Sequence, residues 1–464
     1  MPPVAAASVA EIAPSRYPLD DFLADIAGIA ASTGPIDRKR RSRDYFWYSP
    51  ILYEQLKDKV ADVIVTPRDE AEVIRVAAAC ARHRIPLTVR GGATGNYGQC
   101  VPLDGGVVLD MAALDRIEWQ QPGLVRVEAG AKMFDIDTAT RPNGFELRMH
   151  PSTKRSAQIG GFVAGGSGGV GSVTFGGMRE PGNIVAARIV TLEPVPRVIE
   201  LRGDAAQKIS RAYGTTGIIT ALEMPLAPVQ PWVDIMVAFD DFIDCVRFAQ
   251  TIAMADGIVK KLISPVEWPV PQYFSAFRAH CPEGKSLLTC MIGAMSVDSF
   301  ATLLAAAGGT TTYRAPSEDV AAKAPLYEHT WNHTTLQMLK IDRGVTYLQC
   351  LYPHDRIDQA VGKVGELFGG EVLQHLEFIR LNGFMTASGI PILRYSSPER
   401  VYEIIAGFES CGVMIANPHV VTLEDGSRYK RVDADQLGFK HEVDPMGLLN
   451  PGKMRSFVPM EHAP

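Results

Sequence analysis

The chain has 464 residues, of which 46% are hydrophobic and 21% are charged, and its formal net charge at pH 7 is −6. This length exceeds what one hydrophobic core usually supports, so we expect two domains of an ordinary globular protein. The acidic balance gives no reason to expect nucleic acid or an anionic membrane surface as a partner.

The sequence carries no sign of export or membrane insertion. Residues 1–14 are small and apolar, but they lack a basic start and contain Glu11, which argues against a signal peptide. No uninterrupted apolar run reaches the ~20 residues that a membrane span needs. The seven cysteines are scattered and odd in number, unlike a disulfide framework. We therefore expect a cytoplasmic protein without a membrane span.

A basic run and an aromatic run precede the first regular elements. Residues 38–43 (Arg-Lys-Arg-Arg-Ser-Arg) form a basic cluster that stands alone in an acidic chain. We expect a solvated turn there rather than a nucleic-acid patch. Residues 45–48 (Tyr-Phe-Trp-Tyr) are expected to cover a core edge or to line the mouth of a pocket.

Residues 61–89 are predicted to form a strand–helix–strand unit. Residues 61–67 are a strand that ends at Pro67, and residues 69–84 carry apolar side chains at a helical period. Residues 87–89 are the next strand. Three elements within about thirty residues make a βαβ unit.

A glycine-rich loop follows that second strand. It reads Pro-Leu-Thr-Val-Arg-Gly-Gly-Ala-Thr-Gly-Asn-Tyr-Gly-Gln over residues 86–99. Glycines at this density let the backbone turn sharply and approach a ligand closely. Successive main-chain N–H groups in such a loop form a concavity that suits a phosphate or pyrophosphate.

Further elements are expected up to residue 222. The predicted strands are residues 106–110, 124–129, 184–192 and 217–222, and the predicted helices are residues 131–143, closed by Gly144, and 205–213. Two more glycine-rich blocks lie in this region: Met149–Thr153 with residues 159–172 and 175–177, and Tyr213–Thr220.

One of these blocks allows a second interpretation. Residues 166–171 satisfy G-x-G-x-x-G, and Glu193 lies about twenty residues further on, as in a Rossmann dinucleotide site. That fingerprint requires a strand before it and a helix after it. Residues 157–164 are interrupted by glycine and residues 173–177 are a poor helix start, so the Rossmann reading is the weaker one.

Prolines mark a boundary near residue 228. Pro225, Pro228 and Pro231 punctuate the chain, and strand-like and helical runs alternate from residue 232 to about residue 422. The runs include residues 233–238, 286–295, 346–351 and 357–368. We expect this part to be a separate α+β domain.

The three glycine-rich blocks, in this order, resemble the FAD-binding domain of the p-cresol methylhydroxylase and vanillyl-alcohol oxidase superfamily. Residues 444–453 (Asp-Pro-Met-Gly-Leu-Leu-Asn-Pro-Gly-Lys) resemble its closing signature. The resemblance implies an α+β fold in which a two-part FAD-binding domain receives an inserted α+β cap that supplies most of the substrate pocket. The expected divisions are residues 1–228 for the FAD-binding part, 229–422 for the cap and 423–464 for the returning segment.

The same resemblance assigns the cofactor contacts. The first loop would cradle the pyrophosphate, the second block would pass the isoalloxazine and ribityl chain, residues 218–219 would meet the adenine, and Asn450 would approach the flavin. The implied residues are Arg90, Gly91, Gly92, Ala93, Thr94, Gly95, Asn96, Tyr97, Gly98, Gln99, Pro151, Ser152, Thr153, Gly160, Gly161, Ala164, Gly165, Gly166, Gly168, Gly169, Gly171, Ser172, Phe175, Gly176, Ile218, Ile219 and Asn450.

Non-covalent FAD is expected. Some members of the superfamily tether the flavin through a histidine of the first loop, where this chain has Ala93. Cys100 does not match the cysteine that other members use. Attachment through a residue of the cap stays open.

Histidines of the second part are the candidates for acid–base chemistry. His329 and His333 are four residues apart and would share one face of a helix, which is half of a metal site; His375 or His419 would be a third ligand. The spacing leaves open a metal site at His329 and His333, but we predict no metal. His333 and His419 are the predicted bases, because histidine titrates near working pH.

The predicted reaction is hydride transfer from a small alcohol, with 2-hydroxy acids favoured, to flavin N5. A carboxylate would be gripped by an arginine such as Arg343, Arg380 or Arg394. The alternatives are a phenolic substrate bound near Tyr45, Tyr48 and Tyr327, a nicotinamide-dependent dehydrogenase, and a catalytically silent binding module. Oxygen or an electron carrier would accept the electrons, and a homo-oligomer stays open.

Overall fold

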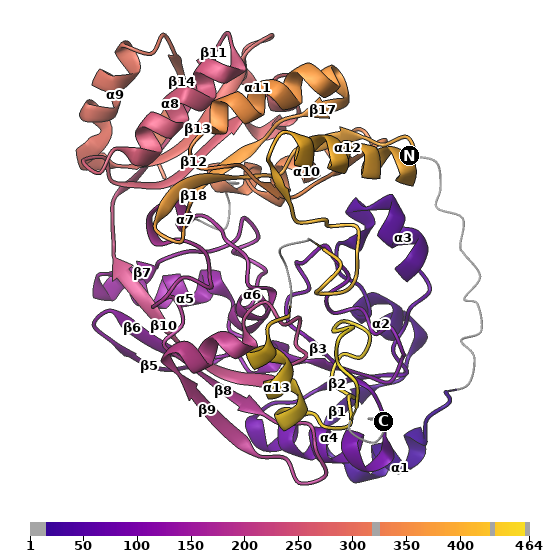
Figure 1. Cartoon of the computed structure of the whole chain (residues 1–464). Helices are drawn as coiled ribbons and strands as arrows, with labels where there is room; N and C mark the ends of the chain where they lie inside the picture. Colours follow the sequence, from indigo (N-terminus) through magenta and orange to yellow (C-terminus); the bar gives the residue numbers. More distant parts are fainter. Residues whose placement is uncertain (1–14, 318–324, 427–431, 460–464) are drawn as a thin grey trace.

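The computed structural model describes residues 15–317, 325–426 and 432–459. Two bodies lie one above the other (Figure 1): residues 15–228 with the C-terminal segment below, and residues 232–415 above. Strands and helices are mixed throughout, which confirms the α+β prediction. No helix within the described ranges is long and apolar enough to cross a membrane.

The first sheet contains the predicted βαβ unit. Its strands run in the order β1-β2-β4-β3, and β2, β4 and β3 are parallel. The strands are β1 (Ala30–Ser32), β2 (Val63–Thr66), β3 (Leu87–Arg90) and β4 (Val107–Asp110), and the helices around them are α1 (Leu19–Asp25), α2 (Pro35–Arg41), α3 (Pro50–Leu56) and α4 (Glu70–His83). Asp69 begins α4 by accepting a hydrogen bond from the N–H of Glu72, and α4 buries Val73, Val76 and Cys80 against the sheet.

The second sheet is antiparallel, in the order β5-β6-β10-β8-β9, and β7 pairs with the far end of β10. Its strands are β5 (Ile117–Gln121), β6 (Leu124–Glu128), β7 (Phe145–Leu147), β8 (Ala186–Val190), β9 (Val198–Arg202) and β10 (Ile218–Pro228), and its helices are α5 (Met133–Thr140), α6 (Ile159–Gly165) and α7 (Ser172–Phe175). Pro225 lies inside β10, opposite Leu124, whereas Pro228 ends it. The predicted helix 205–213 is a 3₁₀ segment, Gly203–Ile209.

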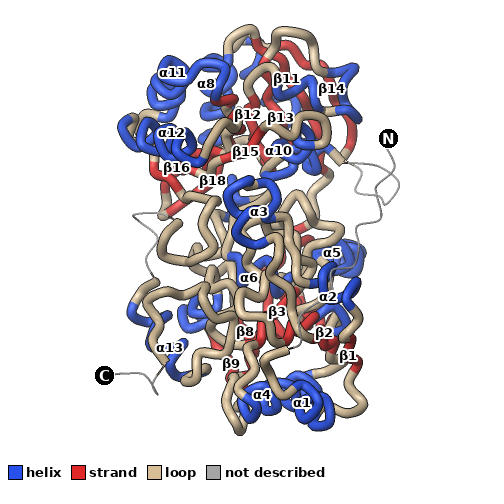
Figure 2. Tube along the Cα trace, turned by 90° about the vertical axis from the view of Figure 1, so that its right-hand side faces the viewer, coloured by secondary structure: helices blue, strands red, loops and turns tan. Residues whose placement is uncertain are grey.

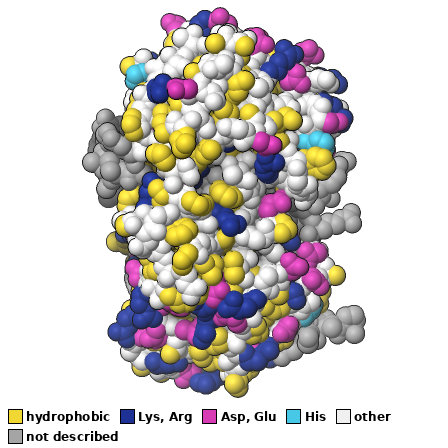
Figure 3. All heavy atoms as spheres, turned by 90° about the vertical axis from the view of Figure 1, so that its left-hand side faces the viewer, with side chains coloured by type: hydrophobic (Ala, Val, Ile, Leu, Met, Phe, Trp, Pro, Cys, Tyr) yellow, Lys and Arg dark blue, Asp and Glu magenta, His cyan; other side chains and the backbone are white. Residues whose placement is uncertain are grey.

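An ionic network covers part of this sheet. Arg126 of β6 lies 2.8 Å from Glu118, 2.7 Å from Glu200 and 2.8 Å from the buried Glu223. These carboxylates raise the pKa of Arg126 above its ordinary value. Figure 3 shows side chains of both charges crowded at this lower end of the molecule.

The cap contains three antiparallel sheets, in the orders β12-β13-β11-β14, β15-β20-β17 and β18-β19-β16-β21. The strands are β11 (Trp232–Phe239), β12 (Lys260–Val266), β13 (Ser286–Gly293), β14 (Thr310–Pro316), β15 (Val345–Tyr347), β16 (Cys350–Leu351), β17 (Val372–Leu373), β18 (Leu376–Leu381), β19 (Phe384–Gly389), β20 (Ile392–Arg394) and β21 (Met414–Ile415). The helices are α8 (Phe242–Met254), α9 (Val297–Ala305), α10 (Asn332–Leu339), α11 (Ile357–Phe368) and α12 (Pro398–Ser410). Figure 2 shows α8, α11 and α12 along one side of the cap. The single strand predicted over residues 346–351 is two short strands.

The C-terminal segment returns to the lower body. Helix α13 (Ala434–Val443) lies beside the second sheet, where the N–H of Leu192 donates to the carbonyl of Val443. The N–H of Leu87 donates to the carbonyl of Leu448, and the N–H of Asn450 donates to the carbonyl of Leu87. Strand β3, which leads to the glycine loop, is therefore held by residues more than 350 positions away.

The basic cluster at residues 38–43 is the end of a helix, not a solvated turn. The Arg38 side chain donates to the carbonyl of Ala61 at 2.6 Å, and Arg41 lies 3.0 Å from Asp110. The Arg43 side chain donates to the carbonyl of Lys57 at 2.9 Å. These arginines hold the N-terminal helices against the first sheet.

Candidate functional site

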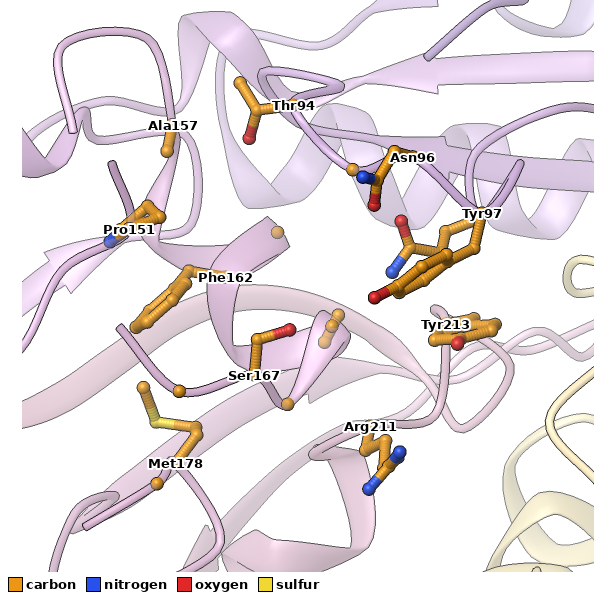
Figure 4. Close-up of a pocket in the computed structure, with 18 of the residues that line it drawn as sticks. Thr94, Asn96, Tyr97, Pro151, Ala157, Phe162, Ser167, Met178, Arg211 and Tyr213 are labelled. Carbon is orange, nitrogen blue, oxygen red and sulfur yellow. The ribbon is translucent and has the colours of Figure 1, made fainter. Parts of the chain in front are cut away.

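A cavity of about 640 Å³ is lined by residues of both bodies. Its wall contains residues of all three glycine-rich blocks together with residues of the cap strands β16, β18, β19 and β21. This volume is in the usual range for a small-molecule or cofactor site. Figure 4 shows the pocket with Thr94, Asn96, Ser167, Arg211 and Tyr213 around it.

The first glycine loop presents free backbone donors to this cavity. In the parts of the chain that the structure describes, no hydrogen-bond acceptor is paired with the N–H groups of residues 91–96. The carbonyls of the loop have partners: Gly95 accepts from the N–H of Tyr45 at 2.8 Å, and Gly98 accepts from Nζ of Lys453 at 2.6 Å. Unpaired N–H groups of this kind suit a pyrophosphate.

The loop is supported by two buried charges. Asp44, which lines the cavity, accepts a hydrogen bond from the N–H of Phe46 at 2.9 Å. Burial raises the pKa of the Asp44 carboxyl to about 6 and lowers the pKa of Lys453 to about 8, while their mutual attraction opposes both shifts. Asp44 precedes the aromatic run and belongs to no motif, so no sequence pattern pointed to it.

Asn450 also acts from behind the loop. Its Nδ2 donates to the carbonyl of Gln99 at 2.9 Å and to the carbonyl of Tyr213 at 2.6 Å. Asn450 is buried and does not line the cavity. The structure therefore shows Asn450 joining the first and third blocks, where the resemblance implied direct contact with the flavin.

Residues 159–165 of the second block form helix α6 in spite of their glycines. Gly160 packs against the end of β6, where an added Cβ would lie 2.7 Å from the Cβ of Ala129, the residue that follows this strand. Because a helix precedes Gly166 and only the four-residue α7 follows, the strand and the long helix that a Rossmann fingerprint requires are both missing at this position. The Rossmann reading of residues 166–171 is wrong.

Helix α7 supports the cap. The N–H of Gly171 donates to the carbonyl of Lys261 at 2.7 Å, and Thr174 Oγ1 donates to the carbonyl of Lys260 at 2.6 Å. Val173 packs into the cap core. Gly171 has φ +106° and lies so close to Arg148 that a Cβ would be 2.0 Å from its carbonyl oxygen, which only glycine tolerates.

The cofactor residues implied by the resemblance fall into two groups. Those on the cavity wall are Gly91, Gly92, Ala93, Thr94, Gly95, Asn96, Tyr97, Gln99, Pro151, Ser152, Thr153, Gly160, Gly161, Ala164, Gly165, Gly166, Gly168 and Ile219. Those away from the wall are Arg90, Gly98, Gly169, Gly171, Ser172, Phe175, Gly176, Ile218 and Asn450. Arg90, for example, donates to the carbonyl of Arg43 at 2.7 Å, and Ile218 is buried in the core of the first sheet.

The histidine pair does not share a helix face. His329 ends a 3₁₀ segment (Leu326–His329), whereas His333 lies in α10, and Trp331 between them has φ +53°. Within residues 15–317, 325–426 and 432–459, no three His, Cys, Asp or Glu side chains are grouped so that they could hold a metal ion. The i, i+4 geometry on which the half-site depended is therefore absent.

The two histidines predicted as bases lie outside the cavity. His419 is buried, with Nδ1 2.7 Å from Oγ of Ser49, and burial lowers its pKa to about 4. Burial lowers the pKa of His333 to about 4 as well. Neither side chain lines the wall, so the structure brings neither of them to the place where a substrate would react.

The predicted carboxylate and phenolate ligands are also elsewhere. Arg343 lies over the ring of Trp47, Arg380 lies 3.4 Å from Asp256, and Arg394 donates to the carbonyl of Gly370. Neither these arginines nor Tyr45, Tyr48 and Tyr327 line the cavity. The tyrosines that line it are Tyr97 and Tyr213.

The cap side of the wall was not identified from the sequence. It consists of Trp331, Asn332, Gln349, Cys350, Leu351, Ile379, Leu381, Asn382, Ser388, Met414, Ile415 and Ala416. Trp331 is held by its backbone N–H, which donates at 2.6 Å to the buried carboxylate of Glu377. Its indole lies against Gly168, where an added Cβ would be 3.0 Å from the ring. These residues come from short strands and turns that carry no motif.

Comparisons with known proteins agree with this geometry. Residues 61–194 match the family described as an FAD binding domain. The glycolate oxidase subunit GlcD of Escherichia coli (strain K12) is 28% identical over 207 residues, which are 42% of this chain and 41% of that protein. The D-2-hydroxyglutarate dehydrogenase of the same organism is 32% identical over 168 residues, which are 33% of this chain and 16% of that protein. The alignments thus span about two fifths or less of these relatives.

The fold is shared over nearly the whole chain. A solved structure of alkyldihydroxyacetonephosphate synthase superposes with a TM-score of 0.72 and 16% identity, covering 96% of this chain and 86% of that one. The sequence matches, this fold and the glycine-rich loops that meet at the cavity confirm the resemblance. The chain therefore contains an FAD binding domain over residues 61–194 and is similar to FAD-linked oxidoreductases, with FAD as the cofactor.

Proposed function

We propose that this protein is an FAD-dependent oxidoreductase that oxidises the hydroxyl-bearing carbon of a small 2-hydroxy acid to a ketone or aldehyde. The printed names of two relatives refer to glycolate and to D-2-hydroxyglutarate, which are both 2-hydroxy acids. The observation that carries the proposal is the single cavity shared by the cofactor loops and the cap, because a substrate bound from the cap side reaches the cofactor there.

The roles of the chain's own residues follow from their positions. The N–H groups of residues 91–96 would hold the pyrophosphate, and Asp44, Asn450 and Lys453 would keep the loop in shape behind them. Trp331 would close the cap side over Gly168 and exclude water. Bound FAD would supply the two-electron acceptor for the hydride, and the hydroxyl proton would leave to a base or to water.

The 2-hydroxy acid is favoured over a phenolic substrate. Phenol oxidation would need groups on the wall that stabilise a phenolate, and the tyrosines expected for it lie elsewhere. Burial raises the pKa of Tyr97 and of Tyr213, so both wall tyrosines stay protonated. They act as neutral hydrogen-bond donors.

Anaerobic titration of the holoenzyme tests the function. We expect 2-hydroxy acids to bleach the flavin absorption, and alditols, sugars and phenols to bleach it far more slowly or not at all. The His333→Gln and His419→Gln variants should bleach within about threefold of the wild-type rate, because neither side chain lines the cavity. A panel in which only phenols bleach the flavin would refute the proposal. Readmitted air then shows whether oxygen is the acceptor.

We further propose that the FAD is not covalently bound. Burial raises the pKa of the Cys100 thiol, which lines the cavity beside the loop, to about 12, so the thiol stays protonated and a poor nucleophile. Position 93, where some relatives carry a histidine, is alanine. Precipitation with acid should therefore release all yellow colour into the supernatant. A pellet that stays yellow would contradict this.

A further inference from the structure

Arg211 is a cation on the cavity wall for which the described residues provide no partner. Within the described ranges its guanidinium makes no hydrogen bond and no ion pair, and burial lowers the pKa of the group. Its backbone has φ +54°, and it packs so tightly on the second block that a Cβ on Gly166 would lie 2.4 Å from its own Cβ. The Cα and Cβ of Arg211 are thus fixed in a strained turn, and a charge without a protein partner among the described residues indicates a ligand site.

Two tyrosines line the same cavity as this cation. Tyr97 and Tyr213 are near enough to act electrostatically on Arg211, and Figure 4 shows all three on the same side of the pocket, across from Ser167. Both phenols stay protonated, so their O–H groups can donate hydrogen bonds to an anion. One guanidinium and two neutral O–H groups make a surface that favours a negatively charged ligand.

The other charges on the described wall have nearby partners. Asp44 interacts with Lys453, Oε1 of Glu180 accepts from the N–H of Asn382 at 2.8 Å, and Arg179 lies 3.5 Å from Asp433. The charge of Arg211 is therefore not used to neutralise a carboxylate of the protein. It is available to a ligand.

The location of Arg211 favours the substrate rather than the cofactor phosphates. The pyrophosphate already has the free N–H groups of residues 91–96 as donors. Arg211 lies against Gly166, two residues before Gly168, which touches Trp331 of the cap. It thus lies beside the segment where the lower body meets the cap, which is where a substrate would enter.

We propose that Arg211 binds the carboxylate of the substrate, assisted by the hydroxyls of Tyr97 and Tyr213. This inference rests on the proposed 2-hydroxy acid oxidation and deepens it. Arginine is suited to the task because its planar fork pairs with both carboxylate oxygens. The carboxylate site would then belong to the FAD-binding body, whereas the sequence had suggested arginines of the cap.

Binding of oxalate to the oxidised holoenzyme tests the inference without turnover. Oxalate carries the carboxylate but cannot lose a hydride, and its binding should perturb the visible flavin spectrum. We expect Arg211→Gln to raise the Kd for oxalate about 10–100-fold, and Arg211→Lys to give an intermediate value because the charge remains without the fork. The matched control is Arg394→Gln, an exposed cap arginine outside the cavity, which should bind oxalate like the wild type.

The outcomes separate this inference from the proposed function. An Arg211→Gln variant whose Kd for oxalate stays within threefold of the wild-type value would overturn the inference. A wild-type protein that binds no oxalate would overturn it as well. If the Arg211→Gln variant loses affinity for FAD as well as for oxalate, the inference is also overturned, because Arg211 would then bind the cofactor. If oxalate binding depends on Arg211 but no 2-hydroxy acid bleaches the flavin, the anion site is upheld and the proposed reaction is refuted.

Discussion

Replacing Glu146 by alanine should lower the free energy of unfolding by about 3–5 kcal/mol, because it leaves a buried ammonium group without its counter-charge. Glu146 lies on β7 of the lower body, and its Oε1 is 2.8 Å from Nζ of Lys261 on β12 of the cap. The indole N–H of Trp232, on β11, donates to the same oxygen at 2.8 Å. The side chains of Glu146 and Lys261 are only 2% and 5% exposed, so water cannot replace the lost contact.

Chemical denaturation measures this effect, and two further variants check its cause. Glu403→Ala, which removes a surface carboxylate 2.6 Å from Arg400, should leave the unfolding curve close to that of the wild type. The double variant Glu146→Leu with Lys261→Met should recover most of the loss, since neither charge is then buried. A double variant as unstable as Glu146→Ala would show that packing, and not the unpaired charge, explains the cost.

The same pair shows how the chain fixes the position of the cap. Glu146 belongs to the lower body and Lys261 to the cap, and the chain passes from one body to the other between β10 and β11. The segment at α7 also donates hydrogen bonds to the carbonyls of Lys260 and Lys261. These contacts set how far the cap wall lies from the glycine loops. The geometry of the cavity therefore depends on residues that do not line it.

Local sequence patterns predicted the parts of the fold that local interactions determine. The apolar period of residues 69–84 was sufficient to predict α4, and glycine density located the first loop. The expectation that His329 and His333 share one helix face was wrong because it assumed an unbroken helix. The backbone N–H of Trp331 instead donates to Glu377, and the backbone turns there.

The rest of the site depends on contacts between residues far apart in the chain. Lys453 reaches the carbonyl of Gly98 across 355 positions, and Asn450 reaches that of Gln99 across 351. No periodicity or spacing in the sequence encodes such contacts. The cap wall and Arg211 were missed for the same reason, since isolated polar residues acquire a role only when the two bodies come together.

Replacing Gly92 by alanine should weaken FAD binding about 10–100-fold, because the added methyl group forces the first loop away from the second block. A Cβ at Gly92 would lie 2.2 Å from the carbonyl oxygen of Ser156, which is backbone and cannot rotate away. The N–H groups of residues 91–96 would then move relative to Ala157 and Gln158, which adjoin the loop on the cavity wall.

The neighbouring glycine provides the matched control for this prediction. At Gly91 the nearest atom to an added Cβ is Oε1 of Gln158, 3.1 Å away at the end of a flexible side chain, so Gly91→Ala should cost less than tenfold. Fluorescence titration of the apoprotein with FAD measures both affinities, and circular dichroism confirms that each variant folds. Because the two substitutions add the same methyl group one residue apart, equal losses of affinity would contradict the steric explanation and would imply that any bulk in the loop blocks the pyrophosphate.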